Sequence, residues 1–299
     1  MTAPYNHPEI DDCLFHYTSA GGLKGILESQ CIWATDSAFL NDSSEIRYAG
    51  LAVERHLDNM IGHLKLLDPQ PGSEEKKRLH YISQAKEALA ELNNADEYTG
   101  SAPYIVDGAT YVSCFNANPD QLSQWRGYGG HGYSVGFTKA GLNRLVIEGD
   151  PSPVLPKVIQ VGYGQPALDK LFQEISKFFE DNPDVFLLSA TGNIAAASYS
   201  LPRLAQVKHA SFEEEKEWRA VVPRYASGPT SPLYFREGEG TRLVPYIKLR
   251  FEPSDVAYVY VGPGGDFHDK RALRAFLRAN GYDLDRVWIE HSSAPFRGG

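Results

Sequence analysis

The chain has 299 residues, of which 42% are hydrophobic and 22% charged, which is ordinary for a globular protein that buries a sizeable core. Its formal net charge of −9 argues against a general nucleic-acid binder, although a local basic groove is still allowed. The three cysteines (Cys13, Cys31 and Cys114) are widely spaced, and fit neither a disulfide framework nor a zinc site. Since no signal peptide and no membrane-spanning run is found, we expect a cytoplasmic protein with no membrane partner.

The first part of the chain alternates short β patterns with helical ones. In chain order, we predict a strand over 13–18, a helix over 22–29 capped by Ser19, a strand over 31–35, a helix over 42–57 and an amphipathic helix over 74–92. The polar stretch 93–103 has the composition of a loop.

The rest of the chain is richer in β patterns. Strands are predicted over 111–115, 133–138, 158–163, 217–223, 244–251, 257–261 and 287–291, and helices over 121–125, 168–179, 189–205 and 270–279. The glycine-rich stretch 127–132 is interpreted as a hairpin connection. Because no linker or repeat divides the chain, we predict one α+β domain over 1–299, with a mixed, mainly antiparallel β-sheet and a helical insertion at about 50–108.

The most concentrated charge lies in the segment Glu213–Arg219, which holds four glutamates at the start of a predicted strand. Alternate residues of a strand share a face, so Glu215, Glu217 and Arg219 are expected to point the same way. Two carboxylates and a guanidinium in a row form either a solvated strand edge or the wall of a site.

A second group of candidates follows the first predicted strand. His16 is either a hydrogen-bonded core residue or a catalytic one. Tyr17, Thr18 and Ser19 supply hydroxyl and backbone N–H groups where the strand turns into a helix. Such a turn presents donors to an anion or a sugar, so these residues are candidates for substrate binding.

Two further places hold polar side chains next to predicted helices. Gln124, Trp125 and Arg126 offer a stacking face and a phosphate partner, or else a tryptophan that anchors a short helix to the core. Asn41 precedes a helix start whose Asp42 and Glu45 are explained by capping, which leaves Asn41 as a candidate. The nine histidines are scattered without metal-ligand spacing, so no metal is expected.

Several short segments, in a fixed order along nearly the whole chain, belong together. They are Leu14–Ser19, Phe39–Glu45, Val112–Asn116, Leu122–Arg126, Gly132–Phe137, Lys208, Phe212, Glu215–Arg219, Val261–Pro263 and Ser292–Arg297. Together they resemble a widespread bacterial family known as domain of unknown function 2971. The combination is specific although each segment is short, and it implies no settled activity.

A more distant resemblance implies a chemistry. A strand carrying His16 and Thr18, a helix with Gly25, Ile26 and Leu27, and a second strand are similar to the opening of ADP-ribosyltransferases of the His-Tyr-Glu type. In those enzymes the histidine holds the NAD ribose, an aromatic residue stacks on nicotinamide, and a late-strand glutamate contacts a ribose hydroxyl. The resemblance also implies their fold for the β-sheet core.

Carried over residue by residue, the resemblance assigns roles. It implies that NAD is the substrate, that His16 holds the ribose and amide, that Glu217 is the catalytic carboxylate and that Glu215 lies near the acceptor. The stacking partner is left open among Tyr111, Ser113, Phe115 and Tyr128. Arg219 or Arg126 would hold the pyrophosphate, since arginine is a better bidentate partner for phosphate than lysine.

Cleavage of the nicotinamide–ribose bond passes through an oxocarbenium-like state, which a carboxylate stabilises. We therefore expect an NAD-dependent ADP-ribosyltransferase or NAD glycohydrolase that transfers ADP-ribose to an unknown protein or nucleic-acid acceptor, or to water. Two alternatives stay open. One is a non-catalytic nucleotide-binding module of the same fold, and the other a metal-dependent nuclease or hydrolase using Asp42, Glu45 and the 213–217 glutamates. A role in toxicity or phage defence would suit the enzyme.

Overall fold

The computed structural model of the chain describes residues 7–40, 43–93, 110–150, 155–181, 202–223, 232–238 and 240–295. Its helices are α1 (Ala20–Ser29), α2 (Ser43–Leu66), α3 (Glu74–Asn93), α5 (Leu122–Gln124), α6 (Lys139–Leu142), α7 (Gly164–Asp181) and α9 (Phe267–Ala279), with a π-helical turn η4 (Trp125–Gly129) and a 3₁₀ helix η6 (Ala210–Glu215). Its strands are β1 (Cys13–Thr18), β2 (Cys31–Asp36), β3 (Thr110–Asn116), β4 (Tyr133–Thr138), β5 (Val146–Ile147), β6 (Lys157–Gln160), β7 (Gly162–Tyr163), β8 (Val207–Lys208), β9 (Glu217–Pro223), β10 (Tyr234–Glu237), β11 (Leu243–Arg250), β12 (Val256–Val261) and β13 (Trp288–His291).

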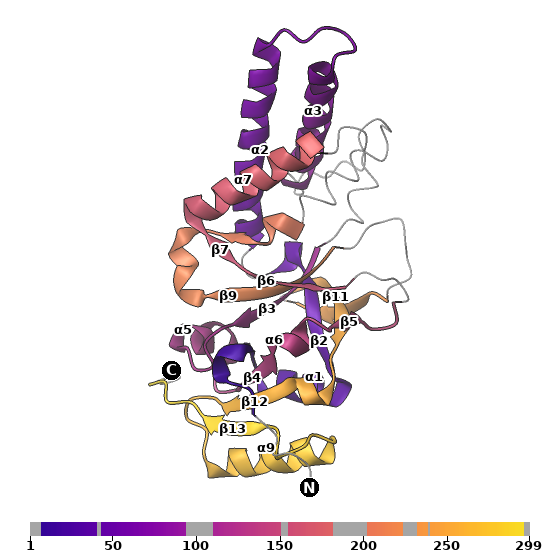
Figure 1. Ribbon diagram of the computed structural model, residues 1–299. Coiled ribbons are helices and arrows are strands. Elements are labelled where there is room, and N and C mark those ends of the chain that lie inside the picture. The colour runs from indigo at the N-terminus through magenta and orange to yellow at the C-terminus, as the bar shows by residue number, and fades with distance from the viewer. Residues whose placement is uncertain are drawn as a thin grey trace.

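Within these described residues, most strands form one sheet in the order β10-β11-β2-β3-β1-β4-β12-β13, while β9 pairs with β3 and β6, and β5 with β11. Its pairs are antiparallel except β12 with β13, which run parallel. The sheet and the helices around it confirm the predicted α+β class with a mainly antiparallel sheet (Figure 1). In the described part of the chain, no helix is long and apolar enough to cross a membrane.

The sheet forks at β3. On one edge, β3 pairs with β9 along its whole length, from Thr110 to Asn116. On the other edge it pairs with β2 near its start, where Val112 faces Thr35, and with β1 at its end, where Asn116 faces Phe15. Between these two pairings the edge of β3 is left open. One arm of the fork is β2-β11-β10 and the other is β1-β4-β12-β13.

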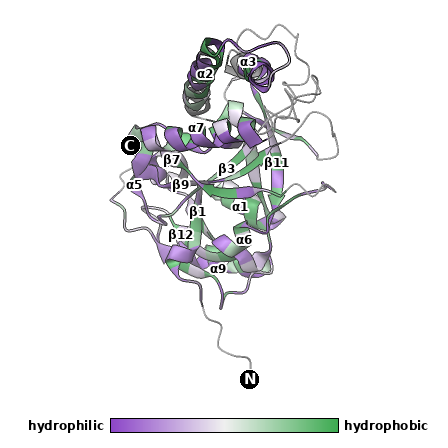
Figure 2. Cartoon of the chain, turned by 45° about the horizontal axis from the view of Figure 1, so that its top comes forward, coloured by the Kyte–Doolittle hydropathy of each residue, from purple (hydrophilic) through white to green (hydrophobic). Residues whose placement is uncertain are grey.

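The main core fills this fork. Its buried residues come from α1, from both arms of the sheet and from α9, including Leu14, Leu27, Ile32, Phe115 and Phe137. Figure 2 shows the matching hydropathy, with β1 and β3 largely in the hydrophobic colour inside the molecule. The N-terminus of α1 confirms the predicted cap, since the Ser19 hydroxyl oxygen accepts from the Gly22 amide at 3.1 Å.

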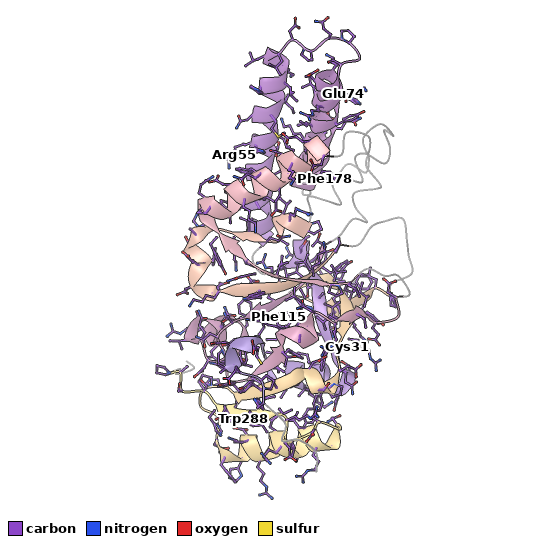
Figure 3. The ribbon with its side chains drawn as sticks, in the orientation of Figure 1. Cys31, Arg55, Glu74, Phe115, Phe178 and Trp288 are labelled. Carbon is purple, nitrogen blue, oxygen red and sulfur yellow. The ribbon has the colours of Figure 1, made fainter. Side chains whose placement is uncertain are left out.

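A second hydrophobic core lies between the helices α2, α3 and α7. Helices α2 and α3 form a hairpin that projects from the sheet, and α7 runs across it (Figure 1). Leu57, Ile82 and Ile175 are buried between these three helices. Figure 3 shows Glu74 and Arg55 on this projecting part and Phe115 in the middle of the molecule. The predicted helix over 42–57 extends to Leu66, and the helix over 74–92 is α3. One domain with an insertion at about 50–108 stays a prediction.

Three local predictions were wrong. The segment 127–132 is not a hairpin connection, because β1 lies between β3 and β4 in the sheet. The predicted strand over 158–163 is divided into β6 and β7, which belong to different sheets. Glu215 ends a 3₁₀ helix rather than lying on the strand, because Lys216 adopts a left-handed conformation with φ of 43°. Of the predicted helix over 189–205, residues 189–201 lie outside the described residues, and 202–204 are helical.

Candidate functional site

A small cavity opens where β1, β3 and β9 meet. It measures about 60 Å³, and its lining brings together residues from three distant parts of the sequence. The lining residues are Phe15, His16, Tyr17, Cys114, Phe115, Gln124, Tyr128, Glu215 and Glu217. Three predicted catalytic residues, His16, Glu215 and Glu217, therefore border one cavity, although 199 positions separate His16 from Glu215.

His16 lies at the fork of the sheet. Its ring Nδ1 is 2.9 Å from the carbonyl oxygen of Cys114, in the stretch of β3 that pairs with neither β1 nor β2 on that edge. Because a carbonyl oxygen only accepts, Nδ1 carries the hydrogen and Nε2 is left as an acceptor. Burial lowers the pKa of His16, against the opposing effect of the bond to Cys114. The ring is therefore neutral near pH 7.

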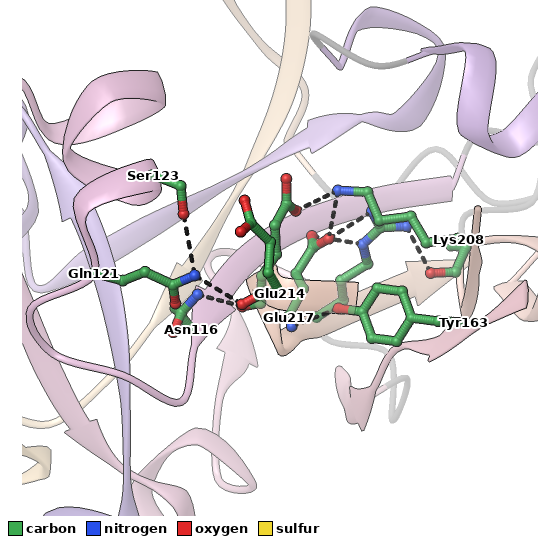
Figure 4. A network of polar contacts seen from close by, with 10 residues as sticks. Asn116, Gln121, Ser123, Tyr163, Lys208, Glu214 and Glu217 are labelled. Atoms are coloured by element: carbon green, nitrogen blue, oxygen red, sulfur yellow. Dashed lines mark hydrogen bonds and ion pairs between the residues drawn. The ribbon is translucent and has the colours of Figure 1, made fainter. Parts of the chain in front are cut away.

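Glu217 is held by two buried cations (Figure 4). The Arg219 guanidinium donates to both carboxylate oxygens, from Nε at 2.7 Å and from Nη2 at 3.0 Å. The Lys208 ammonium donates to Glu217 at 3.1 Å and to Glu215 at 2.5 Å. Arg219 also donates from Nη1 to the carbonyl oxygen of Ala205 at 2.8 Å. Two carboxylates and two cations thus form a neutral cluster beside the cavity.

This cluster sets the ionisation of Glu217. Burial alone would raise the pKa of its carboxyl, but the charge and hydrogen bonds of Arg219, with the charge of Lys208, outweigh it and lower the pKa. The neighbouring Cys114 thiol has its pKa raised, first by burial and then by Glu217. At neutral pH the site therefore holds an ionised Glu217 and a protonated Cys114, which argues against Cys114 as a nucleophile.

The turn that carries Glu215 is fixed from both sides. The Asn116 side-chain amide donates to the carbonyl oxygen of Glu215. The Gln121 side-chain amide donates to the carbonyl oxygen of Glu214 at 2.7 Å. The Tyr163 hydroxyl accepts from the Glu217 amide at 2.8 Å. These contacts explain how Glu215 reaches Lys208 although it does not lie on the strand that carries Glu217.

The loop on the other side of the cavity is anchored by Tyr17. Its hydroxyl donates to the carbonyl oxygen of Asn118 at 2.7 Å and accepts from the backbone N–H of Gln121 at 2.8 Å. Asp120, in the same loop, accepts from Trp125 Nε1 at 2.7 Å and from Ser293. Burial alone would raise the pKa of Asp120, but the hydrogen bonds from its neighbours lower it. The loop that presents Gln124 and Tyr128 is therefore held in place.

Several residues predicted to contact substrate are buried in the structure. Trp125 is fully buried, with 0% of its surface exposed, and packs against the Tyr17 ring at 4.7 Å, so it offers no stacking face. Arg219 is 2% exposed and occupied by Glu217 and Ala205, so it is not placed to hold a pyrophosphate. Ser113 is buried and does not line the cavity.

Other predicted contacts lie apart from the cavity. Arg126 is exposed outside the lining, Thr18 is half-buried, and Ser19 serves as the helix cap. Asn41 lies outside the described residues. Phe115, Gln124 and Tyr17 do border the cavity.

Lys208 is the residue of the site whose role the sequence did not reveal. It is nine positions from Glu217 on a two-residue strand, and no spacing pattern connects the two. The available signal was charge balance, since two carboxylates beside one buried arginine favour a second cation. Among the described residues, no group of three or more His, Cys, Asp or Glu side chains could hold a metal ion.

Comparison with known proteins supports the family resemblance in part. The family model described as "Protein of unknown function (DUF2971)" matches residues 124–220. The match includes β4, Lys208, Glu215, Glu217 and Arg219, and leaves His16 outside. No curated protein and no solved structure matches the chain significantly.

Proposed function

We propose that the cavity bordered by His16 and Glu217 binds the ribose of NAD and cleaves its bond to nicotinamide, passing ADP-ribose to an acceptor or to water. The observation that carries the proposal is the meeting of His16, Glu215 and Glu217 at one cavity. The likeness to the His-Tyr-Glu ADP-ribosyltransferases and their fold is part of the same proposal.

The ionisation states suit this chemistry. A neutral His16 whose Nδ1–H is taken by Cys114 has its Nε2 available to accept from a ribose hydroxyl. An ionised Glu217 stabilises the positive charge that develops on the ribose as the bond to nicotinamide breaks. The electron pair of that bond leaves with nicotinamide. A lone pair of the acceptor then forms the new bond to the ribose carbon, and the acceptor releases its proton to solvent.

The size of the cavity limits how NAD would lie. At about 60 Å³ it is much smaller than the roughly 300–1,000 Å³ of sites that enclose a whole ligand. We therefore place only the ribose hydroxyl edge inside it. The nicotinamide ring would lie over the mouth, where the 50% exposed Tyr128 presents an aromatic ring for a planar group.

A second candidate is a nucleotide-binding module without catalysis. It is favoured by the contacts of Glu217, whose two oxygens are both occupied by Arg219 and Lys208. A carboxylate held in this way binds a hydroxyl less readily than a free one. The metal-dependent alternative stays untested, because Asp42 and the side chain of Glu45 are not described.

The test compares nicotinamide release and transfer of labelled ADP-ribose in the wild type, Glu217→Gln and Glu213→Gln. Glu213 is an exposed carboxylate of the 3₁₀ helix η6, four residues before Glu217, and serves as the matched control. Release that disappears in Glu217→Gln and persists in Glu213→Gln supports the enzyme. Saturable NAD binding without product supports the binding module. Equal release by the two variants, each shown to be folded by circular dichroism, would exclude a catalytic Glu217.

A further inference from the structure

Helix α9 presents a basic stripe to solvent. Its buried side is formed by Leu273 and Leu277, which belong to the main core. The neighbouring face carries Lys270, Arg271, Arg274 and Arg278, with Phe267 at the start of the helix. Positions 267, 271, 274 and 278 are spaced by four, three and four residues, so they follow one line along the helix.

These four cations have no acidic partner among the described residues. Asp266 and Asp269 are the nearest carboxylates in the sequence, and both are engaged in the capping box at the start of α9. Arg271, Arg274 and Arg278 are exposed and Lys270 is half-buried. A stripe of four cations without ion pairs is notable in a chain of net charge −9.

A hollow of about 460 Å³ lies along this stripe, lined by Phe267, Lys270, Arg271, Arg274, Ala275 and Arg278. It is distinct from the cavity at Glu217 and shares no residue with it. Figure 1 shows α9 at the end of the molecule away from the α2–α3 hairpin. Nothing about this surface depends on the proposed NAD chemistry.

We propose that the α9 stripe binds single-stranded nucleic acid, with its cations on successive phosphates and Phe267 stacked on a base. The rise of 1.5 Å per residue puts about 12 Å between Lys270 and Arg278, so the four cations form a line long enough to meet successive phosphates of one strand. Arginine suits phosphate because its planar fork donates two bonds to it.

The aromatic residue selects this partner over others. Phe267 is 72% exposed at the end of the cationic line, and a base in a single strand has a face available to stack on it. Bases within a duplex are stacked on one another and have no such free face. An anionic membrane fits less well, because Leu273 and Leu277 are already buried and leave no apolar side of α9 to insert.

The test measures binding of a fluorescein-labelled twelve-nucleotide single strand to the full chain by fluorescence anisotropy. Four phosphate contacts give a slope of about −3 for log K against log salt concentration, which means roughly fiftyfold weaker binding between 50 and 200 mM salt. The variant Arg274→Ala/Arg278→Ala is expected to halve that slope. The matched control is Lys170→Ala/Lys177→Ala, which removes two exposed cations from α7 and should leave binding unchanged.

Phe267→Ala is expected to weaken binding about tenfold at every salt concentration without changing the slope, because stacking does not release counterions. Phe235→Ala, at an exposed aromatic residue of β10, should have no effect. The same assay is run with a duplex of the same sequence, polyglutamate and phosphatidylserine vesicles. No binding of the single strand, binding unchanged in the α9 variants, or equal binding of any of these three competitors would overturn the proposal.

Discussion

Replacing Glu217 by glutamine removes one charge from the centre of the buried cluster and keeps the side-chain shape. In the wild type this carboxylate accepts three charged hydrogen bonds, at 2.7 and 3.0 Å from Arg219 and at 3.1 Å from Lys208. The glutamine oxygen can accept only some of these bonds, and its amide hydrogens meet cationic donors. Since breaking a buried ion pair costs about 3–5 kcal/mol, we expect the free energy of unfolding to fall by about 3 kcal/mol.

Two comparisons show whether this loss comes from the buried pair. Glu215→Gln removes a more exposed carboxylate that contacts only Lys208 in the cluster, so we expect a loss of about 1–2 kcal/mol. Glu217→Met with Arg219→Met removes both charges and should recover part of the stability lost in Glu217→Gln. Glu213→Gln is exposed and should stay within about 0.5 kcal/mol of the wild type.

The pH dependence has a definite sign. Because the pKa of Glu217 is lower in the folded chain than its ordinary value of 4.5, the unfolded chain takes up the proton first as the pH falls. The contribution of Glu217 is therefore complete above about pH 4.5 and is lost as the pH falls through the lowered folded value. Glu217→Gln should lack this part of the acid sensitivity.

Urea unfolding followed by circular dichroism measures all four variants, at neutral pH and at pH values below 4.5. The reasoning would be refuted if Glu217→Gln unfolds at the same urea concentration as Glu213→Gln. It would also be refuted if the wild type and Glu217→Gln lose stability equally as the medium is acidified.

Three further changes test the loop and the fork. Asp120→Ala leaves the Trp125 indole N–H without its acceptor, so we expect a loss of about 1–2 kcal/mol and faster amide exchange over 118–131; protection equal to the wild type would contradict this. Tyr17→Phe removes the hydroxyl that joins Asn118 and Gln121, so we expect a loss of about 1–3 kcal/mol in urea unfolding; an unchanged midpoint would contradict this. Gly132→Ala would place a methyl group 2.2 Å from a backbone oxygen, so a melting temperature equal to the wild type would show that the packing here is looser than described.

Much of the fold could be predicted because its signals are local. The strand over 13–18 and the Ser19 cap depend on neighbouring residues, and both are present in the structure. The last helix, predicted over 270–279, ends just before Gly281, whose φ of 81° is the left-handed conformation that glycine tolerates. In each case the pattern and the structure it specifies lie within a few residues of each other.

The fork could not be predicted, because it depends on pairings between distant segments. Nothing in the sequence around Cys114 shows that β1 and β2 share one edge of β3, or that the His16 ring bonds to the Cys114 carbonyl oxygen between the two pairings. The exposure of Trp125 was left open for the same reason. A tryptophan beside an arginine looks the same in the sequence whether its ring is exposed or, as here, packed on Tyr17.

The sequence predicted that Glu217 and Arg219 lie together, but it did not predict the contacts of Lys208. Glu217 and Arg219 share a face because they alternate on β9. Glu215 joins them through the left-handed Lys216, and Lys208 joins from a separate strand, so neither follows from the alternation. The cluster is thus a product of tertiary structure.

The most direct measurement of the central claim is the time course of nicotinamide release from NAD by the purified chain, compared with His16→Ala and His63→Ala. His63 is an exposed histidine of α2 and controls for the loss of an imidazole. We expect release by the wild type and His63→Ala, and none by a folded His16→Ala. Release that is absent from the wild type, or that is unchanged in His16→Ala, would contradict it.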